Sequence, residues 1–134
     1  MTRPTTPADV VRALVTGVAA KRYAELPALY ARATNVTHPF AADAPPLRSR
    51  DEIAEHFAAG AASRVGDVDR EVVDLEIHET TDPEVVIAEF AYRWLLPDPH
   101  RVGAVFVVRV RDGEIVESRD YFDAAARAQL DELL

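Results

Sequence analysis

The sequence predicts an α+β domain in which helices cover one face of a curved antiparallel sheet. Three observations support this prediction. Helical periodicity is confined to the first 62 residues and a short tail, strand-like alternation fills residues 67–122, and a hairpin signal joins the last two strands. Three N-terminal helices packed on the sheet would leave a cone-shaped interior, and a short C-terminal helix would follow the last strand.

The length and composition predict one ordinary globular domain. The chain has 134 residues, and no linker or internal repeat divides it. We therefore expect a single domain over residues 1–134, with residues 1–7 disordered. Hydrophobic residues make up 49% and charged residues 28%, a balance that argues against an intrinsically disordered chain.

Charge and cysteine content exclude several classes of function. The net charge of −8 disfavours nucleic acids and anionic membranes as partners. The absence of cysteine excludes disulfides, thiolate metal sites and a cysteine nucleophile. No segment is long and apolar enough for a membrane span, and the first residues lack the apolar core of a signal peptide, so we expect a soluble cytoplasmic protein.

The first helices are predicted from periodic apolar residues. Val10, Leu14 and Val18 fall on one face at helical spacing and predict a helix over residues 8–22. A second, shorter helix is predicted over residues 24–30, where leucines and a tyrosine share one side.

A short strand and a third helix are predicted to follow. Residues 34–38 are rich in β-branched side chains, which favours a strand, and an irregular loop covers residues 40–48. Ser49 and Glu52 then match a capping box, in which serine occupies the N-cap position and glutamate the third helical position. This motif predicts a helix that runs to about residue 62.

The second half of the chain is predicted to form long strands. From residue 67 the period changes to two, and Val73, Leu75 and Ile77 share one face of the first strand. Asp112-Gly113 is a strong signal for a two-residue hairpin turn. The further elements expected are strands over residues 85–94, 101–111 and 114–122, and a helix over residues 124–133 that Asp123 can cap.

Asp120 is the first candidate for chemistry. It shares a strand face with Ser118 and Phe122, and this face is the less charged of the two, so we place it in the interior. Burial would raise the pKa of the carboxyl group and suit it to general acid or base work. The alternative is a strand residue that forms a salt bridge at the end of the sheet.

Two histidines are the next candidates, because histidine can exchange a proton near neutral pH. His56 lies at the edge of the apolar stripe of the third helix. His38 ends the early strand, just before an irregular loop. For each of them, the alternative is a structural histidine held by a backbone group or a turn.

Glu89 and the aromatic stripe that ends at Trp94 are more ambiguous. A glutamate within an apolar strand needs a partner, and Arg109 or Arg119 could supply a structural ion pair. An aromatic stripe on a strand is more often part of a core or a dimer interface than a platform for substrate.

Other types of site are missing from the sequence. It contains neither a glycine-rich phosphate loop nor a G-x-S-x-G motif. Its four histidines are scattered, without the spacing of metal ligands. We therefore expect neither a metal nor an organic cofactor.

Four stretches match a known family pattern, and the resemblance covers nearly the whole chain, from about residue 8 to residue 123. The chain resembles the SnoaL-like branch of the nuclear transport factor 2-like superfamily, which also contains ketosteroid isomerases and limonene epoxide hydrolases. The resemblance implies a curved sheet around a deep apolar pocket, often in dimers that pair through the outer face of the sheet. It rests on residues 24–30 (AELPALY), 36–40 (VTHPF), 50–53 (RDEI) and 108–123 (VRVRDGEIVESRDYFD).

The resemblance to ketosteroid isomerases is incomplete. The position of His38 resembles the one at which ketosteroid isomerases have their aspartate base. Their two oxyanion donors would fall near Leu14 and Phe106, which have no polar hydrogen to donate. The resemblance therefore does not imply ketosteroid isomerisation.

Other members of the superfamily place acids and histidines differently. Asp120 falls where the epoxide hydrolases have one catalytic aspartate, but Ala91 stands near the place of their second acid. Phenazine-biosynthesis proteins are similar in having an acid at the position of Asp120 and a histidine at that of His56.

These observations together predict a cofactor-independent acid/base enzyme. It would act on a small, mostly apolar metabolite, polyketide- or terpenoid-like, by cyclisation, isomerisation, dehydration or epoxide opening, and we expect a homodimer through the outer sheet face. The alternatives are a non-catalytic module for ligand binding or dimerisation, and a protein-interaction domain that uses the exposed sheet face. Asp120, His38 and His56 are the expected catalytic residues. The expected substrate contacts are Phe40, Phe57, Glu89, Trp94, Phe106 and Phe122.

Overall fold

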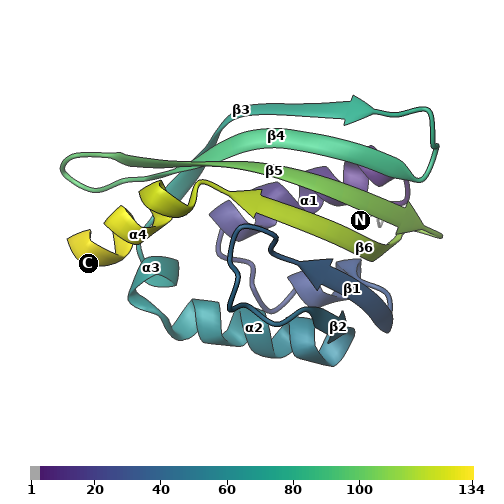
Figure 1. Ribbon diagram of the computed structural model, residues 1–134, viewed down its shortest axis with the longest axis horizontal. Coiled ribbons are helices and arrows are strands. Elements are labelled where there is room, and N and C mark those ends of the chain that lie inside the picture. Colours follow the sequence, from purple (N-terminus) through teal and green to yellow (C-terminus); the bar gives the residue numbers. More distant parts are fainter. Residues whose placement is uncertain (1–3) are drawn as a thin grey trace.

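The computed structural model describes residues 4–134 and confirms the predicted α+β class (Figure 1). Six strands form one sheet in the order β2-β1-β6-β5-β4-β3. The helices lie N-terminal to the long strands, except for one at the C-terminal end. In chain order the elements are α1 (Pro7–Ala19), η1 (Leu26–Leu29), β1 (Ala33–Thr37), β2 (Leu47–Ser49), α2 (Arg50–Ala62), α3 (Arg64–Asp67), β3 (Arg70–Glu79), β4 (Val85–Trp94), β5 (His100–Arg111), β6 (Glu114–Phe122) and α4 (Ala124–Leu133).

Helix α1 begins earlier than the sequence predicts. The Thr6 hydroxyl accepts a hydrogen bond from the Asp9 amide at 3.2 Å, and Pro7 is the first helical residue, where its missing N–H costs nothing. Part of the segment expected to be disordered is therefore the start of a helix, and residues 1–3 lie outside the described residues. The apolar face predicted from periodicity is buried against β3, β4 and β5.

Three short elements differ from the prediction. The second helix is only a 3₁₀ turn, η1, closed by a hydrogen bond of 3.1 Å from the Tyr30 amide to the Pro27 carbonyl. The elements β2 and α3 were not predicted, because segments of three and four residues are too short to show a period. The capping box of α2 is confirmed, since the Ser49 hydroxyl accepts from the Glu52 amide at 3.1 Å.

The sheet is mixed and not wholly antiparallel. Strand β1 runs parallel to β6, with Val36 opposite Ser118 and Thr37 opposite Arg119, while the other pairings are antiparallel. The predicted hairpin between β5 and β6 is confirmed. Its two turn residues, Asp112 and Gly113, have φ values of 53° and 76°, a left-handed pair typical of two-residue hairpins.

A β-bulge in β3 corrects one predicted face. Asp74 has a φ of 56°, and the register with β4 shifts between Val73 and Glu76. Val73 consequently lies opposite Ala91 on the outer face, whereas Leu75 packs against the core on the inner face. The prediction that Val73 shares a face with Leu75 and Ile77 is wrong, because the extra residue at the bulge reverses the alternation.

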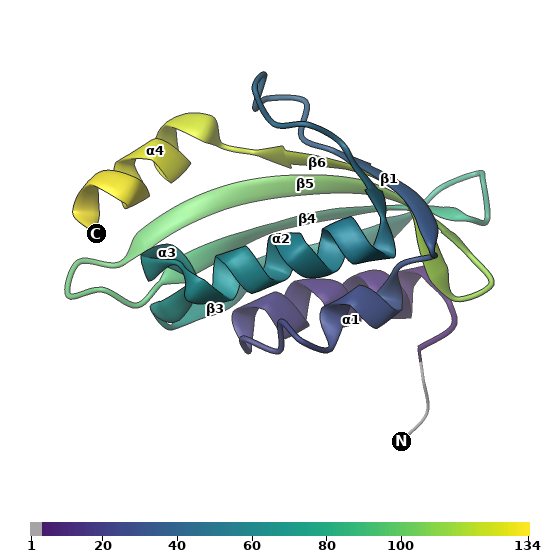
Figure 2. The same ribbon diagram turned by 90° about the horizontal axis from the view of Figure 1, so that it is seen from below.

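The inner face of the sheet forms the core with the N-terminal helices. Figure 2 shows α1 and α2 on the same side of the curved sheet. The aromatic stripe of β4 lies on this face and is confirmed as core, with ring centroids of Phe90 and Tyr92 5.1 Å apart and those of Tyr92 and Trp94 6.1 Å apart. None of the helices formed by residues 4–134 has both the length and the apolar composition that a bilayer crossing requires.

Candidate active site

Asp120 is buried on the inner face of β6, as the sequence predicts. Its side chain is 9% exposed, and it accepts a short hydrogen bond at Oδ1 from the Ser118 hydroxyl. Among residues 4–134 no lysine or arginine forms an ion pair with it. Burial raises the pKa of Asp120 to about 7, although the Ser118 hydroxyl acts in the opposite direction.

His38 reaches Asp120 because of the parallel pairing of β1 with β6. Thr37 lies opposite Arg119, so the next residue along each strand is His38 and Asp120. The His38 Nε2 is 4.0 Å from the Asp120 Oδ2, and the His38 side chain is 17% exposed. The two candidates that are 82 positions apart in sequence are thus neighbours in the fold.

His56 lies on α2, farther out toward solvent. Its ring centroid is 5.9 Å from that of His38 and 5.7 Å from that of Phe57. Burial lowers the pKa of His38, and the charge of a protonated His56 lowers it further; partial burial also lowers the pKa of His56. All three predicted catalytic residues therefore come together at one place.

These pKa shifts place the proton on the carboxyl group rather than on the imidazole. An ordinary aspartate beside a histidine forms an ion pair, with the histidine protonated. Here the pKa of Asp120 is raised to about 7 and that of His38 is lowered from 6.5. Just below about pH 7 the site therefore presents mainly a carboxylic acid beside a neutral imidazole, and above it a carboxylate beside a neutral imidazole, so Asp120 can act as an acid or as a base.

Several polar atoms at and near the site lack a hydrogen bond without being completely enclosed. Among residues 4–134, a single side-chain polar atom is both completely enclosed and without a hydrogen bond. This atom is Arg70 Nε. The Asp120 Oδ2, the His38 ring nitrogens and the Tyr30 hydroxyl have no hydrogen bond either. Since they are not enclosed in this way, each of them borders space that water can enter.

The sequence missed two members of the site. Ser118 was placed on the correct strand face, but without a role, and it binds Asp120 directly. Tyr30 was assigned only to an apolar stripe, although a hydroxyl group within such a stripe is a signal that a buried polar partner or ligand is needed.

The predicted substrate contacts are divided among several places. Phe106 is opposite Asp120 in the sheet register, and Phe122 packs on it with ring centroids 5.4 Å apart. Phe57 lies beside His56. Trp94 belongs to another part of the core, where its indole N–H donates to the Val65 carbonyl at 3.0 Å.

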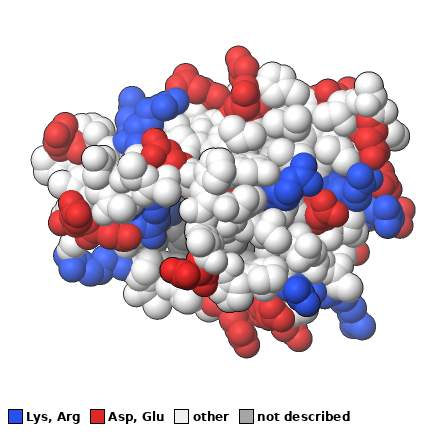
Figure 3. Space-filling model, in the orientation of Figure 1, with Lys and Arg blue, Asp and Glu red and all other residues white. Residues whose placement is uncertain are grey.

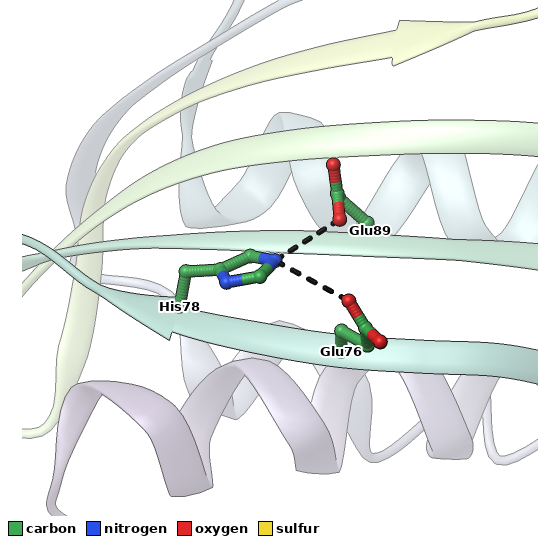
Figure 4. Close-up of side chains that lie close together, drawn as sticks. All are labelled: Glu76, His78 and Glu89. Atoms are coloured by element: carbon green, nitrogen blue, oxygen red, sulfur yellow. Dashed lines mark hydrogen bonds and ion pairs between the residues drawn. The ribbon is translucent and has the colours of Figure 1, made fainter.

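Glu89 lies on the outer face of the sheet, close to Glu76 and His78 (Figure 4), whereas Asp120 is buried on the inner face. Its partner is neither Arg109 nor Arg119, because its carboxylate is 3.0 Å from His78 Nε2. Glu76, directly opposite Glu89 on β3, is 3.8 Å from the same nitrogen. The ligand atoms of these three exposed residues lie within 4.8 Å of one another, a juxtaposition that the scattered histidines of the sequence did not predict.

The two cavities described for residues 4–134 lie away from Asp120. The larger has a volume of about 850 Å³ and lies over the outer face of the sheet, next to Phe40, Glu89, Val105 and Tyr121. The smaller, about 360 Å³, lies between the start of α1 and the turn from β3 to β4. The deep interior pocket that the family resemblance implies is neither of these.

Comparison with known proteins agrees with this architecture. The model of the SnoaL-like domain matches residues 11–118. No curated protein sequence is significantly similar to the chain.

Solved structures share the fold at low sequence identity. A Bacillus subtilis protein provisionally assigned as an isomerase has a TM-score of 0.81 and 18% identity, over 93% of this chain and 91% of that one. A provisional polyketide cyclase from Pseudomonas putida KT2440 has a TM-score of 0.71 and 14% identity, over 92% and 96%. An LEH-like epoxide hydrolase from M. tuberculosis has a TM-score of 0.66 and 21% identity, over 93% and 89%. The chain thus belongs to the SnoaL-like family, whose distant structural relatives include these three kinds of protein.

Proposed function

We propose that the protein is a cofactor-independent acid/base enzyme that acts on a small, mostly apolar metabolite. The observation that carries this proposal is the pair formed by Asp120 and His38, with the reactive atoms 4.0 Å apart. Asp120 serves as general acid or base, and His38 accepts or relays the second proton, with His56 as the link to solvent.

The surroundings of the pair favour an apolar ligand. The rings of Phe57 and Phe106 lie beside the histidines and Asp120, so a bound molecule would meet hydrocarbon on most sides. A polyketide- or terpenoid-like compound fits this description. Cyclisation, isomerisation, dehydration and epoxide opening all require an acid and a base, and the names of the solved relatives are of the same kinds.

The test is exchange of carbon-bound hydrogen. The purified protein is incubated in D₂O with a panel of cyclic ketones and 1,3-dicarbonyl compounds, and loss of proton signal next to the carbonyl is followed by NMR. A parallel panel of epoxides is followed for diol formation. Catalysed exchange or ring opening above the buffer rate is expected, and absence of both over broad panels would contradict the proposal.

A second candidate is a non-catalytic binding module with the same fold. The observation that favours it is the aromatic filling of the interior, where the ring centroids of Phe90 and Phe106 are 5.0 Å apart. This alternative expects ligands from the same panels to bind without exchange or ring opening.

We also propose a homodimer that forms through the outer face of the sheet. Figure 3 views this face, where uncharged surface lies between charged side chains of both signs. Val105 lies on this face in β5, between Glu89 of β4 and Tyr121 of β6, and is 36% exposed. Apolar residues exposed on a broad sheet face favour association with a second copy.

A charge at the centre of this face is expected to separate the dimer. Sedimentation of Val105→Glu should give a monomer at concentrations where the unaltered protein is a dimer, because the new carboxylate would be buried without a partner. Leu133→Glu is the matched control, since Leu133 is an exposed apolar residue of α4, 60% accessible. A monomeric unaltered protein, or a dimer that Val105→Glu leaves intact, would contradict this assembly.

A further inference from the structure

Tyr30 is a buried phenol that the acid/base pair does not use. It follows η1 and is 2% exposed. Its backbone is fixed on two sides, because its carbonyl accepts from Arg50 Nε at 2.9 Å and it forms a parallel bridge with Ile115 of β6. Its ring packs on that of Phe57, with centroids 6.4 Å apart. The side chain therefore has little freedom to move.

The hydroxyl of Tyr30 has no hydrogen-bond partner within residues 4–134. Other tyrosines of the core are paired: the Tyr92 hydroxyl donates to the Val15 carbonyl at 2.9 Å, and the Tyr23 hydroxyl donates to the Gly66 carbonyl at 3.0 Å. An unpaired buried hydroxyl lowers the stability of the fold. Because this oxygen is not completely enclosed, a bound molecule can supply the missing partner.

Ring contacts connect Tyr30 to the acid/base site, because Tyr30 packs on Phe57, whose ring centroid is 5.7 Å from that of His56. The charge of Asp120 acts on Tyr30 and, after burial, is the next cause that raises the pKa of the phenol. Tyr30 therefore stays protonated over the physiological range and can act as a hydrogen-bond donor. It comes from the segment before β1, while Asp120 comes from β6, so the two groups approach a ligand from different elements.

We propose that the Tyr30 hydroxyl donates a hydrogen bond to a carbonyl oxygen of the substrate, which would make the substrate an enolisable carbonyl compound. This inference rests on the proposed acid/base function and narrows its reaction class. Leu14 and Phe106, near which the resemblance places the two oxyanion donors of ketosteroid isomerases, have no polar hydrogen to donate. Tyr30 supplies such a donor from another element.

The reaction step is a proton transfer within the bound complex. The Asp120 carboxylate removes a proton from the carbon next to the carbonyl, and the C–H electron pair forms a carbon–carbon double bond. The carbonyl π pair moves onto oxygen, where the Tyr30 O–H stabilises the enolate. The proton on the Asp120 carboxylic acid exchanges with solvent through His38 and His56, and Asp120 then protonates a carbon of the enolate, so that no oxidant, reductant or further co-reactant is consumed.

The experiment uses 4-nitrophenol, whose phenolate resembles an enolate and whose absorbance reports its ionisation. Asp120→Asn provides a neutral site, and its affinity for the phenolate is compared with that of Asp120→Asn/Tyr30→Phe. We expect the loss of the Tyr30 hydroxyl to weaken binding on the order of tenfold or more, as for a hydrogen bond to a charged group. The matched control is Asp120→Asn/Tyr121→Phe, which removes a hydroxyl from the outer face and should bind like Asp120→Asn.

Equal phenolate affinities with and without the Tyr30 hydroxyl, including undetectable binding in both, would overturn the proposal. Thermal unfolding of Tyr30→Phe alone gives a second test, because an unpaired hydroxyl adds nothing to the fold. Its midpoint is expected to equal or exceed that of the unaltered protein. A lower midpoint would also overturn the proposal, since it would mean that the hydroxyl is bonded within the fold.

The two proposals can fail separately. If the unaltered protein exchanges ketone protons but the phenolate affinities are equal, the role of Tyr30 is overturned and the acid/base function stands. If the phenolate affinities differ but neither ketone exchange nor epoxide opening is catalysed, Tyr30 is supported as an oxyanion-binding group and the catalytic function is wrong.

Discussion

Replacement of Asp120 by asparagine is expected to lower the exchange rate of an accepted ketone by roughly 10²–10⁴-fold, the usual contribution of a positioned acid or base. Asparagine has nearly the same shape and can still accept the hydrogen bond from Ser118. It cannot take or give the proton. The rate is measured by NMR in D₂O at several pH values for the variant and the unaltered protein.

The pH profile and two controls make this result specific. If Asp120 acts as the base, kcat/KM should rise through about pH 7, where its carboxyl group ionises. Glu117→Gln removes an exposed carboxylate from the same strand, and His78→Gln removes a histidine from the outer face, so both should retain the rate. A rate in Asp120→Asn within a few-fold of the unaltered protein would contradict the role of Asp120.

Asp120 is also expected to make the stability of the protein depend on pH. Burial raises its pKa from 3.8 to about 7, so the folded state binds a proton that the unfolded state has released between these pH values. The stabilisation from the protonated form is complete below pH 4 and is lost as the pH rises through about 7. The difference between these pKa values corresponds to at most about 4 kcal/mol of free energy of unfolding.

Comparing the unaltered protein with Asp120→Asn isolates the contribution of Asp120 to the pH dependence of stability. The lowered pKa values of His38 and His56 make stability rise with pH up to about 6.5, which opposes the effect of Asp120. These histidines are present in both the unaltered protein and Asp120→Asn, so the difference between the two in urea unfolding reports on Asp120. The variant should gain stability relative to the unaltered protein between pH 4 and pH 8, by a few kcal/mol. Parallel pH dependences would mean that the carboxyl group titrates normally.

The local patterns of the sequence were sufficient for most of the fold. The Ser49 capping box, the Asp112-Gly113 turn and the alternation of β4 are set by neighbouring residues, and each is confirmed. The bulge at Asp74 was missed, because an aspartate with positive φ leaves no clear mark in a hydrophobic pattern. Because the bulge was missed, the prediction placed Val73 on the wrong face of the sheet.

The site was harder to predict than the fold, because it depends on pairing between distant segments. The sequence placed Asp120 in the interior through the parity of its strand, and burial confirms this position. The contact of His38 with Asp120 requires the parallel pairing of β1 with β6, which no local pattern specifies. That the Tyr30 hydroxyl lacks a hydrogen bond can be seen only in the structure, where the positions of all its possible partners among residues 4–134 are known.

The most direct measurement is the pKa of Asp120 itself. The protein is labelled with ¹³C at aspartate side-chain carboxyl carbons, the signal of Asp120 is assigned by its absence in Asp120→Asn, and its chemical shift is followed with pH. A midpoint near pH 7 is expected if the carboxyl group is a buried acid poised beside a neutral His38. A midpoint near the ordinary value of 3.8 would show an ionised aspartate at neutral pH, and the acid/base pair would not exist in the form described.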